Sequence, residues 1–175
     1  MPSRIRYRVA ASLDGRIEGP QGEIDWIVGD PEIDFQSIMK EFDTVLVGRQ
    51  TFETMVRVRR TMMPGMKTIV LSRTLHQSDY PEVAVIREDH RETLDALRIH
   101  AGKDIWLFGG GSLFRSLLEW RMVDTVEVAI MPALLGGGVP LVYSREAGLG
   151  PYGKLTLEAH QVYKSGIVSL TYAVR

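Results

Sequence analysis

Short apolar runs rich in β-branched residues recur along the chain, with amphipathic stretches between them. Residues 4–11 alternate polar and apolar side chains before turning apolar, a pattern that predicts a first strand. Further buried strands are expected at 44–47, 68–71, 83–86, 105–108 and 125–131. Helices are expected at 51–56, 92–100 and 112–122. Strands that alternate with helices in this way are typical of a mainly parallel α/β sheet.

The stretch after the first strand departs from this alternation. Residues 12–29 are rich in glycine, which predicts a long loop of the kind that often carries function. Asp30 followed by Pro31 then predicts the start of a helix, with the aspartate as N-cap. This helix is expected to run to about Phe42 and to bury Ile38 and Phe42, which are spaced i, i+4.

The C-terminal part of the chain predicts an antiparallel hairpin. Residues 155–163 and 167–174 are strand-like and flank the turn sequence Lys164-Ser165-Gly166. The glycines at 136–138 follow a strand without a helix-start pattern, which favours a flexible connection over a second ligand loop. The expected fold class is therefore α/β, with a mixed, mainly parallel central sheet flanked by helices and a C-terminal antiparallel hairpin.

Composition narrows the class of protein. A chain of 175 residues that is 45% hydrophobic and 25% charged has the size and balance of one compact domain. Its net charge of -1 gives no overall positive potential that would attract nucleic acid. The lack of cysteine excludes disulfides, cysteine-ligated metals and a cysteine nucleophile. The histidines are scattered without ligand spacing, so no metal site is expected.

The sequence shows no signal for secretion or for a membrane span. The first residues carry alternating arginines in place of an apolar signal sequence. The longest uncharged run, 128–144, contains prolines and glycines and is too short to cross a bilayer. We therefore expect a cytoplasmic protein that binds neither membranes nor nucleic acid.

Consecutive glycines stand where a predicted buried strand gives way to a helix, in Phe108-Gly109-Gly110-Gly111-Ser112. Glycine lets backbone N–H groups approach a phosphate closely, and a helix N-terminus adds positive potential. We interpret this segment as an anion cradle, with a tight turn capped by Ser112 as the alternative. The spacing matches neither the G-x-G-x-x-G motif of dinucleotide-binding folds nor a Walker A loop.

An arginine follows each of two predicted strands. Gly48-Arg49-Gln50-Thr51 follows one, and Ser72-Arg73-Thr74 follows the next. Open α/β sheets bind ligands at these carboxyl ends, and a planar guanidinium group matches a phosphate monoester. Together with the glycine cradle, the two arginines indicate a dinucleotide with an additional phosphate, NADPH rather than NADH. Solvated surface arginines are the alternative interpretation.

Four segments carry a resemblance to a known family: AASLDGRI at 10–17, VGRQTFE at 47–53, IVLSR at 69–73 and FGGGSL at 108–113. The sequence resembles the dihydrofolate reductase-like fold and, within it, the reductase domain of bacterial riboflavin biosynthesis and its stand-alone relatives. The resemblance implies a single domain of this type over residues 1–175. It also implies an NADPH cofactor across the C-terminal ends of the strands, and a homodimer.

The resemblance assigns candidate cofactor-binding residues. Backbone groups of Ala10 and Ile17 would hold the nicotinamide carboxamide, and Thr51 would help the glycine segment to hold the pyrophosphate. The adenosine 2′-phosphate would lie at Arg49, Ser72 and Arg73. The full set expected to bind the cofactor is Ala10, Ile17, Gly48, Arg49, Thr51, Leu71, Ser72, Arg73, Phe108, Gly109, Gly110, Gly111, Ser112 and Leu113.

Three further residues are candidates for the substrate side of the site. Asp34 is the candidate catalytic acid, because dihydrofolate reductases place an acid on the helix after the first long loop. An exposed aspartate in the first turn of a helix is the alternative. Asp14 and Trp26 are candidate substrate-binding residues. Asp14-Gly15 is also an ordinary turn sequence, and Trp26 could instead cover the core.

Two departures from the riboflavin reductases leave the substrate open. The chain has none of the cysteines of the zinc deaminase domain that the bifunctional enzyme carries, and Phe52-Glu53-Thr54-Met55 is closer to the dihydrofolate reductase pattern. We expect an NADPH-dependent reductase that transfers hydride to a small heterocyclic or sugar-linked imine or carbonyl. The first candidate is 5-amino-6-(5-phosphoribosylamino)uracil. The alternatives are a dihydrofolate or pterin reductase and a non-catalytic nucleotide-binding module.

Overall fold

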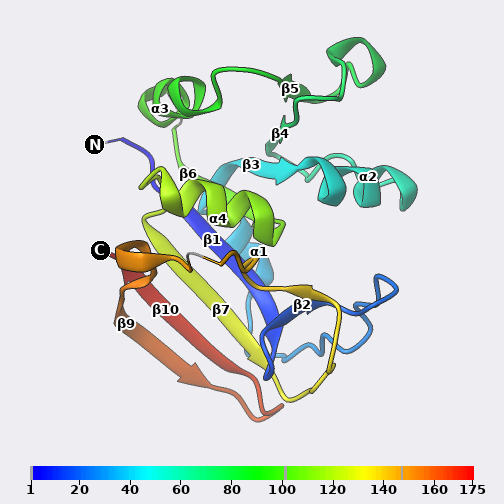
Figure 1. Ribbon diagram of the computed structural model, residues 1–175. Coiled ribbons are helices and arrows are strands. Elements are labelled where there is room, and N and C mark those ends of the chain that lie inside the picture. The colour runs from blue at the N-terminus through cyan, green and yellow to red at the C-terminus, as the bar shows by residue number, and fades with distance from the viewer. Residues whose placement is uncertain (1, 101, 147) are drawn as a thin grey trace.

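The computed structural model describes residues 2–100, 102–146 and 148–175 (Figure 1). Most of its strands form one mixed sheet: β1 (Ile5–Ser12), β3 (Phe42–Gly48), β4 (Lys67–Leu71), β5 (Ala84–Ile86), β6 (Asp104–Gly109), β7 (Thr125–Met131), β9 (Leu155–Val162) and β10 (Val168–Val174). The helices are α1 (Phe35–Met39), α2 (Arg49–Arg57), α3 (His90–His100) and α4 (Gly111–Glu119), with short 3-10 helices at Gln77–Asp79 and Gly150–Gly153. Within the described residues, no helix is both long and apolar enough to span a bilayer.

The strand order of the large sheet is β5-β4-β3-β6-β1-β7-β10-β9, which places the first strand well inside the sheet. All neighbours from β5 to β7 run parallel, whereas β10 pairs antiparallel with both β7 and β9. The expected fold class, a mainly parallel sheet with a C-terminal antiparallel hairpin, is confirmed. Because β3, β4 and β6 run parallel, their carboxyl ends meet at one edge of the sheet.

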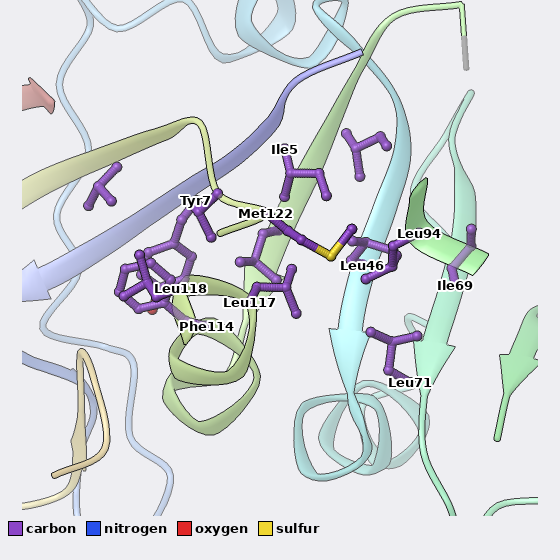
Figure 2. Packing of buried hydrophobic residues seen from close by; sticks show 14 of the residues in the cluster. Ile5, Tyr7, Leu46, Ile69, Leu71, Leu94, Phe114, Leu117, Leu118 and Met122 are labelled. Atoms are coloured by element: carbon purple, nitrogen blue, oxygen red, sulfur yellow. The ribbon is translucent and has the colours of Figure 1, made fainter. Parts of the chain in front are cut away.

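One face of the sheet packs against α4. Figure 2 shows Phe114, Leu117 and Leu118 on the side of α4 that faces the strands, in one buried cluster with Tyr7 of β1 and Leu46 of β3. The rings of Tyr7 and Phe114 stack with their centroids 3.8 Å apart. Full burial contributes about 1.5–3 kcal/mol for each such side chain. This layer therefore fixes α4, and with it the start of the helix, against the sheet.

The opposite face packs against α2. Successive side chains of a strand point to opposite faces, so Val45 and Val47 lie on the side of β3 opposite Leu46. They form a second buried cluster with Phe52 and Met55 of α2. The start of α2 is thereby held at the same edge of the sheet as the start of α4.

The helix expected from Asp30 is shorter than predicted and begins later, since α1 spans only Phe35–Met39. Its N-cap residue is Asp34 and not Asp30, which corrects the sequence prediction. Phe42 is buried as predicted, but it is the first residue of β3 and not part of a helix. Ile38 lies in α1 but is only half-buried, so the prediction that it is buried is wrong. The i, i+4 spacing of apolar residues was therefore a coincidence between a short helix and the strand that follows it.

Asp30 has a different structural task. Its buried carboxylate accepts hydrogen bonds from the backbone N–H groups of Glu32, at 2.9 Å, and of Ser165, at 3.0 Å. Ser165 lies in the turn between β9 and β10, so Asp30 ties the long loop after β2 to the terminal hairpin. A partner this remote in sequence outweighs the local capping preference of an Asp-Pro pair.

Two short strands lie outside the elements that the sequence predicts. β2 (Arg16–Glu18) and β8 (Val139–Pro140) pair antiparallel and form a small second sheet. Gly138, next to β8, packs tightly on the end of β2, because a Cβ there would lie 2.1 Å from the carbonyl oxygen of Glu18, whereas a Cβ at Gly136 would meet nothing within 4 Å. The flexible connection expected at 136–138 stays a prediction. Strands of two or three residues have no hydrophobic period by which they could be recognised.

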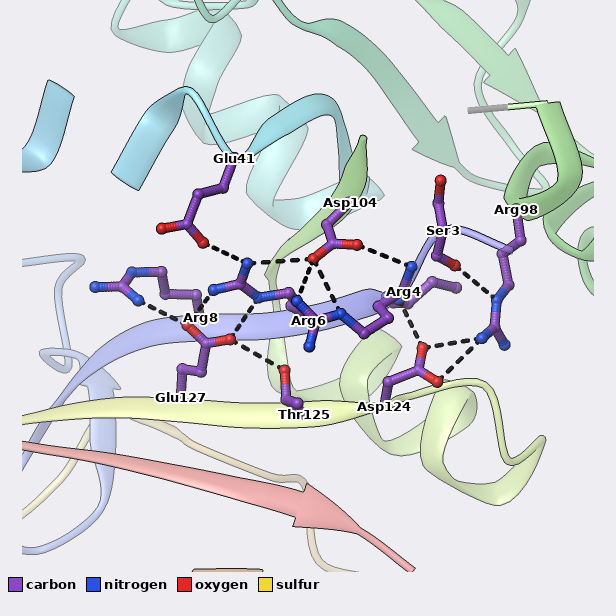
Figure 3. A network of polar contacts seen from close by, with 11 residues as sticks. Ser3, Arg4, Arg6, Arg8, Glu41, Arg98, Asp104, Asp124, Thr125 and Glu127 are labelled. Atoms are coloured by element: carbon purple, nitrogen blue, oxygen red, sulfur yellow. Dashed lines mark hydrogen bonds and ion pairs between the residues drawn. The ribbon is translucent and has the colours of Figure 1, made fainter. Parts of the chain in front are cut away.

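Arg6 and Arg8 of β1 and Glu127 of β7 form a charged cluster on the sheet face opposite α4 (Figure 3). Arg6 of β1 donates from Nε and Nη2 to the carboxylate of Glu127 on β7, at 2.6 and 2.9 Å. Arg8 donates to the same carboxylate at 2.6 Å. Burial alone would raise the pKa of Glu127, but the hydrogen bonds and charges of both arginines hold it below its usual value. The cluster therefore fastens β1 to β7 through a fully ionised, buried pair.

We expect Glu127→Gln to lower the free energy of unfolding by about 3 kcal/mol, because Arg6 loses the carboxylate that both Nε and Nη2 bind and keeps only the charges of Glu41 and Asp104. Urea denaturation of variant and wild type measures the difference. Glu53→Gln is the matched control, since it breaks the exposed Arg49–Glu53 pair on α2 and should cost roughly 0.3–0.5 kcal/mol. Equal losses in the two variants would contradict the stabilising role of the buried cluster.

Candidate functional site

A cavity with a volume of about 980 Å³ opens at the carboxyl ends of β3, β4 and β6. This is the edge at which open α/β sheets bind ligands. The described residues that line it are Ile17, Glu18, Gly48, Arg49, Gln50, Thr51, Glu53, Thr54, Arg57, Leu71, Ser72, Arg73, Thr74, His90, Gly110, Gly111, Ser112, Leu113, Ser116, Trp120, Val139, Tyr143 and Arg145. They come from the ends of the three strands and the turns after them, from α2, from the start of α3, from β2 and β8, from one side of α4 and from the segment after β8.

Two helices begin at this cavity. α2 starts after Gly48 and α4 starts after Gly110, and neither N-cap residue supplies a side-chain hydrogen bond. The two starts are close together, because a Cβ at Gly48 would lie 3.9 Å from the backbone nitrogen of Gly110. The first N–H groups of a helix lack intrahelical acceptors and carry a positive partial charge. The cavity therefore has two converging sets of backbone donors that suit an anion.

Backbone geometry requires glycine just before and at the start of α4. Gly109 has a φ of +145°, which a residue with a side chain rarely adopts, and its peptide bond to Gly110 is cis. A Cβ at Gly111 would lie 2.6 Å from the carbonyl oxygen of Pro140. A Cβ at Gly110 would lie 3.3 Å from Oγ1 of Thr51, on the side where the two helix starts meet. The glycines thus allow the start of α4 to pack closely against Pro140 on one side and against the Thr51 hydroxyl on the other.

Positive side chains outnumber negative ones around the cavity. The charged residues that line it, apart from His90, are Arg49, Arg57, Arg73, Arg145, Glu18 and Glu53. Arg49 and Glu53 form an exposed ion pair at 3.0 Å within α2. Among the described residues, no group of three or more acidic, histidine or cysteine side chains could hold a metal ion. The excess of arginine favours a ligand that carries several negative charges.

The turn after β4 presents Arg73 to solvent at the cavity. Ser72 is buried, and its Oγ accepts hydrogen bonds from the backbone N–H groups of Thr74, at 3.2 Å, and Leu75, at 3.1 Å. A serine that bonds its own following backbone fixes a tight turn. The side chain of Arg73 is therefore exposed while its backbone is held in place.

The structure brings most of the expected cofactor-binding residues to this cavity: Ile17, Gly48, Arg49, Thr51, Leu71, Ser72, Arg73, Gly110, Gly111, Ser112 and Leu113. Ala10 in β1, and Phe108 and Gly109 at the end of β6, do not line it. Ser112 lies inside α4, whose N-cap is Gly110, so the alternative in which Ser112 caps the helix is wrong. The binding roles of all these residues stay predictions.

Asp14 braces two loops and does not line the cavity. Its carboxylate accepts hydrogen bonds from the backbone N–H groups of Leu135, at 3.0 Å, and Gly136, at 2.8 Å, and from the Ser12 hydroxyl, at 2.7 Å. These hydrogen bonds lower the pKa of Asp14 from 3.8 to about 2. Asp14 thus joins the turn between β1 and β2 to the segment before β8. A direct contact with substrate stays a prediction.

Asp34 and Trp26 lie between β2 and β3, and neither lines the cavity. The Asp34 carboxylate accepts hydrogen bonds from the backbone N–H group and the hydroxyl of Ser37, at 3.0 and 2.7 Å. These bonds lower the pKa of Asp34 below its usual value. Trp26 is half-buried and donates from Nε1 to the carbonyl oxygen of Glu23 at 2.9 Å. The acid role of Asp34 and the substrate contact of Trp26 stay predictions.

Several residues at the cavity are missed by the sequence analysis: Glu18, His90, Ser116, Trp120, Val139, Tyr143 and Arg145. Ser112, Ser116 and Trp120 follow one another at four-residue spacing and so share one side of α4. That spacing is a signal that the sequence contains. Tyr143 and Arg145 stand in irregular chain, where no period or motif marks them.

We expect Asp14→Asn to lower the melting temperature at neutral pH, because two backbone N–H groups lose a charged acceptor. The folded pKa of Asp14 lies below the unfolded value of 3.8, so its stabilisation is present above that value and is lost as the pH falls toward about 2. The difference in melting temperature between variant and wild type should shrink over the same range. Thermal unfolding followed by circular dichroism at a series of pH values measures it. A difference that does not change with pH would refute the assignment.

Both the sequence and the fold match known proteins. A family model described as the RibD C-terminal domain matches residues 3–169. The chain is 30% identical over 181 residues to the uncharacterized protein YyaP of Bacillus subtilis, an alignment that covers 97% of this chain and 94% of that one.

Two solved structures share the architecture. The diaminohydroxyphosphoribosylaminopyrimidine deaminase/5-amino-6-(5-phosphoribosylamino)uracil reductase of Thermotoga maritima gives a TM-score of 0.74 at 16% identity, with 99% of this chain matched to 57% of that one. Dihydrofolate reductase from Enterococcus faecalis, complexed with NADP(H), gives a TM-score of 0.70 at 19% identity, over 98% and 96% of the two chains. These structures show that the fold is dihydrofolate reductase-like. Since the family model matches nearly the whole chain, this protein belongs to the RibD C-terminal domain family.

Proposed function

We propose that this protein is a reductase that binds NADPH in the large cavity and transfers hydride to a small heterocyclic substrate. The observation that carries the proposal is the convergence of two helix starts, both with glycine N-caps, in a cavity lined by arginines. Membership of the RibD C-terminal domain family supports a reductase. The NADP(H) bound by the dihydrofolate reductase of the same fold supports the choice of coenzyme.

The cavity residues suit the phosphates of such a coenzyme. Backbone N–H groups at Gly111, Ser112 and Leu113 would hold the pyrophosphate, and the Thr51 hydroxyl at Gly110 would assist them. Glycine at 110 leaves no side chain between the Thr51 hydroxyl and the backbone at the helix start, because a Cβ there would lie 3.3 Å from Oγ1 of Thr51. The fit therefore rests on the glycines and on the absence of an N-cap side chain.

Residues on either side of this cradle would bind the adenosine and nicotinamide ends of the coenzyme. Arg49, Arg73 and the Ser72 hydroxyl would hold the 2′-phosphate. Backbone groups of Ala10 and Ile17, on β1 and β2, would orient the carboxamide. When bound, the coenzyme supplies a hydride from its nicotinamide ring. The chain's own part is to fix the ring against the substrate and to exclude water.

The proposed substrate is 5-amino-6-(5-phosphoribosylamino)uracil. The Thermotoga maritima protein of the same fold is named for the reduction of this compound. Membership of the RibD C-terminal domain family supports the same class of reaction for this chain. The protein would act as a single domain over residues 1–175 and as a homodimer, as the resemblance implies, and the sequence leads us to propose that it does so in the cytoplasm. The alternative, a dihydrofolate or pterin reductase, would need an acid that faces the substrate, and Asp34, the N-cap residue of α1, is the candidate for that role.

We expect Arg73→Ala to weaken NADPH binding by about tenfold or more and to leave NADH binding nearly unchanged, because only NADPH carries the 2′-phosphate. Fluorescence titration with each coenzyme measures the two dissociation constants. Arg91→Ala is the matched control, because Arg91 is an exposed arginine of α3 that does not line the cavity. Equal weakening of both coenzymes would remove Arg73 from the 2′-phosphate, and failure of the wild type to bind either would sink the proposed function.

The proposed acid role of Asp34 predicts that Asp34→Asn lowers kcat by about a hundredfold. The melting temperature should stay close to that of the wild type, because asparagine also caps helices, whereas Asp34→Ala should cost about 1 kcal/mol of stability. Steady-state loss of NADPH absorbance with the pyrimidine substrate, and then with dihydrofolate, provides the rates. An unchanged kcat in Asp34→Asn would leave Asp34 as a helix cap alone.

A further inference from the structure

A buried arginine holds the segment after β8 against α4, where the segment forms one wall of the cavity. The guanidinium group of Arg115 donates from Nε to Glu119 at 2.8 Å and from Nη1 to the carbonyl oxygen of Tyr143 at 2.9 Å. Its Nη2 donates to the carbonyl oxygen of Gly148. Only 3% of Arg115 is exposed. Backbone on both sides of Arg145 is thereby fixed to the helix.

Arg145 is the cation that this segment presents at the cavity. Its side chain is 58% exposed, and its Nη1 lies 3.5 Å from Oε2 of Glu119, which is long for a charged hydrogen bond. An exposed pair of this kind contributes little stability. Glu119 also keeps its hydrogen bond to Arg115 through Oε1. Arg145 can therefore leave Glu119 at small cost and without stranding an unpaired carboxylate.

The position of Arg145 complements that of the other arginines. Arg49 begins α2 directly after β3, and Arg73 lies in the turn after β4. Arg145 lies in the segment after β8, which packs against α4 and lines the cavity from that side. We infer that Arg145 turns from Glu119 to a phosphate of the bound coenzyme and closes the phosphate site from the α4 side. This inference rests on the proposed function. Both the pyrophosphate and the 2′-phosphate present the oxyanion that a guanidinium group recognises.

Arg115 is the positioning residue of this arrangement. Arg115 itself does not line the cavity, and its three partners are Glu119 and the backbone carbonyls of Tyr143 and Gly148. Since the backbone around Arg145 is anchored at Tyr143 and Gly148, only the Arg145 side chain has to move. Binding then loses little conformational entropy in the backbone.

The test is the affinity of Arg145→Ala for NADPH and for NADH, measured by fluorescence titration on the full-length protein. We expect the dissociation constant to rise about tenfold, which is typical of losing one charge-assisted contact. The melting temperature should stay within error of the wild type, because the Arg145–Glu119 pair is exposed. Arg145→Lys keeps the charge without the planar fork and should lose less affinity. Arg91→Ala, with an exposed arginine away from the cavity lining, should change nothing.

The two coenzymes distinguish the two phosphates. Equal weakening of NADPH and NADH in Arg145→Ala would place the contact at the pyrophosphate, and weakening of NADPH alone would place it at the 2′-phosphate. Unchanged affinity for both, with a wild type that binds, would overturn this inference and leave the proposed function standing. A wild type that binds neither coenzyme would overturn the proposed function itself.

Discussion

The first backbone N–H groups of a helix need acceptors that the helix itself does not provide. In this protein α2 and α4 both begin at glycine, so no capping side chain meets that need, and the two starts lie next to each other. Apolar layers on opposite faces of the sheet hold the helices there, α4 on one face and α2 on the other. Packing that stabilises the fold thus also sets the direction of the dipoles at the cavity.

The arginines divide into two groups by how fully they are paired. Arg6 and Arg115 are buried, and each guanidinium group is met by several carboxylate or carbonyl oxygens. Arg73 and Arg145 stand exposed at the cavity on backbone that hydrogen bonds hold in place. Guanidinium groups whose nitrogens all donate hydrogen bonds within the protein fix strands and segments to one another, whereas those with few partners have N–H donors left to bind a ligand.

Elements with a regular hydrophobic period were predictable from the sequence, and contacts between distant irregular segments were not. The prediction for β7 agrees with Thr125–Met131, because burial in a parallel sheet imposes an apolar run. Motif resemblance identified residues after β3, β4 and β6 that do meet at one cavity. The start of α1 was misplaced because the partner of Asp30 lies 135 residues away. Arg145 is held at the cavity because Arg115 donates hydrogen bonds to the backbone carbonyls of Tyr143 and Gly148, and such bonds leave no pattern in the sequence.

The anchor between Asp30 and Ser165 divides the long loop between β2 and β3 into two shorter free spans. A shorter span samples fewer conformations, so ordering it over a ligand bound at the sheet edge costs less entropy than ordering an unanchored loop of the full length. The turn of β9 and β10 is built from the last residues of the chain, yet it limits how far an early loop can travel. Substitutions in the turn between β9 and β10 would therefore alter the mobility of a loop near the opposite end of the sequence.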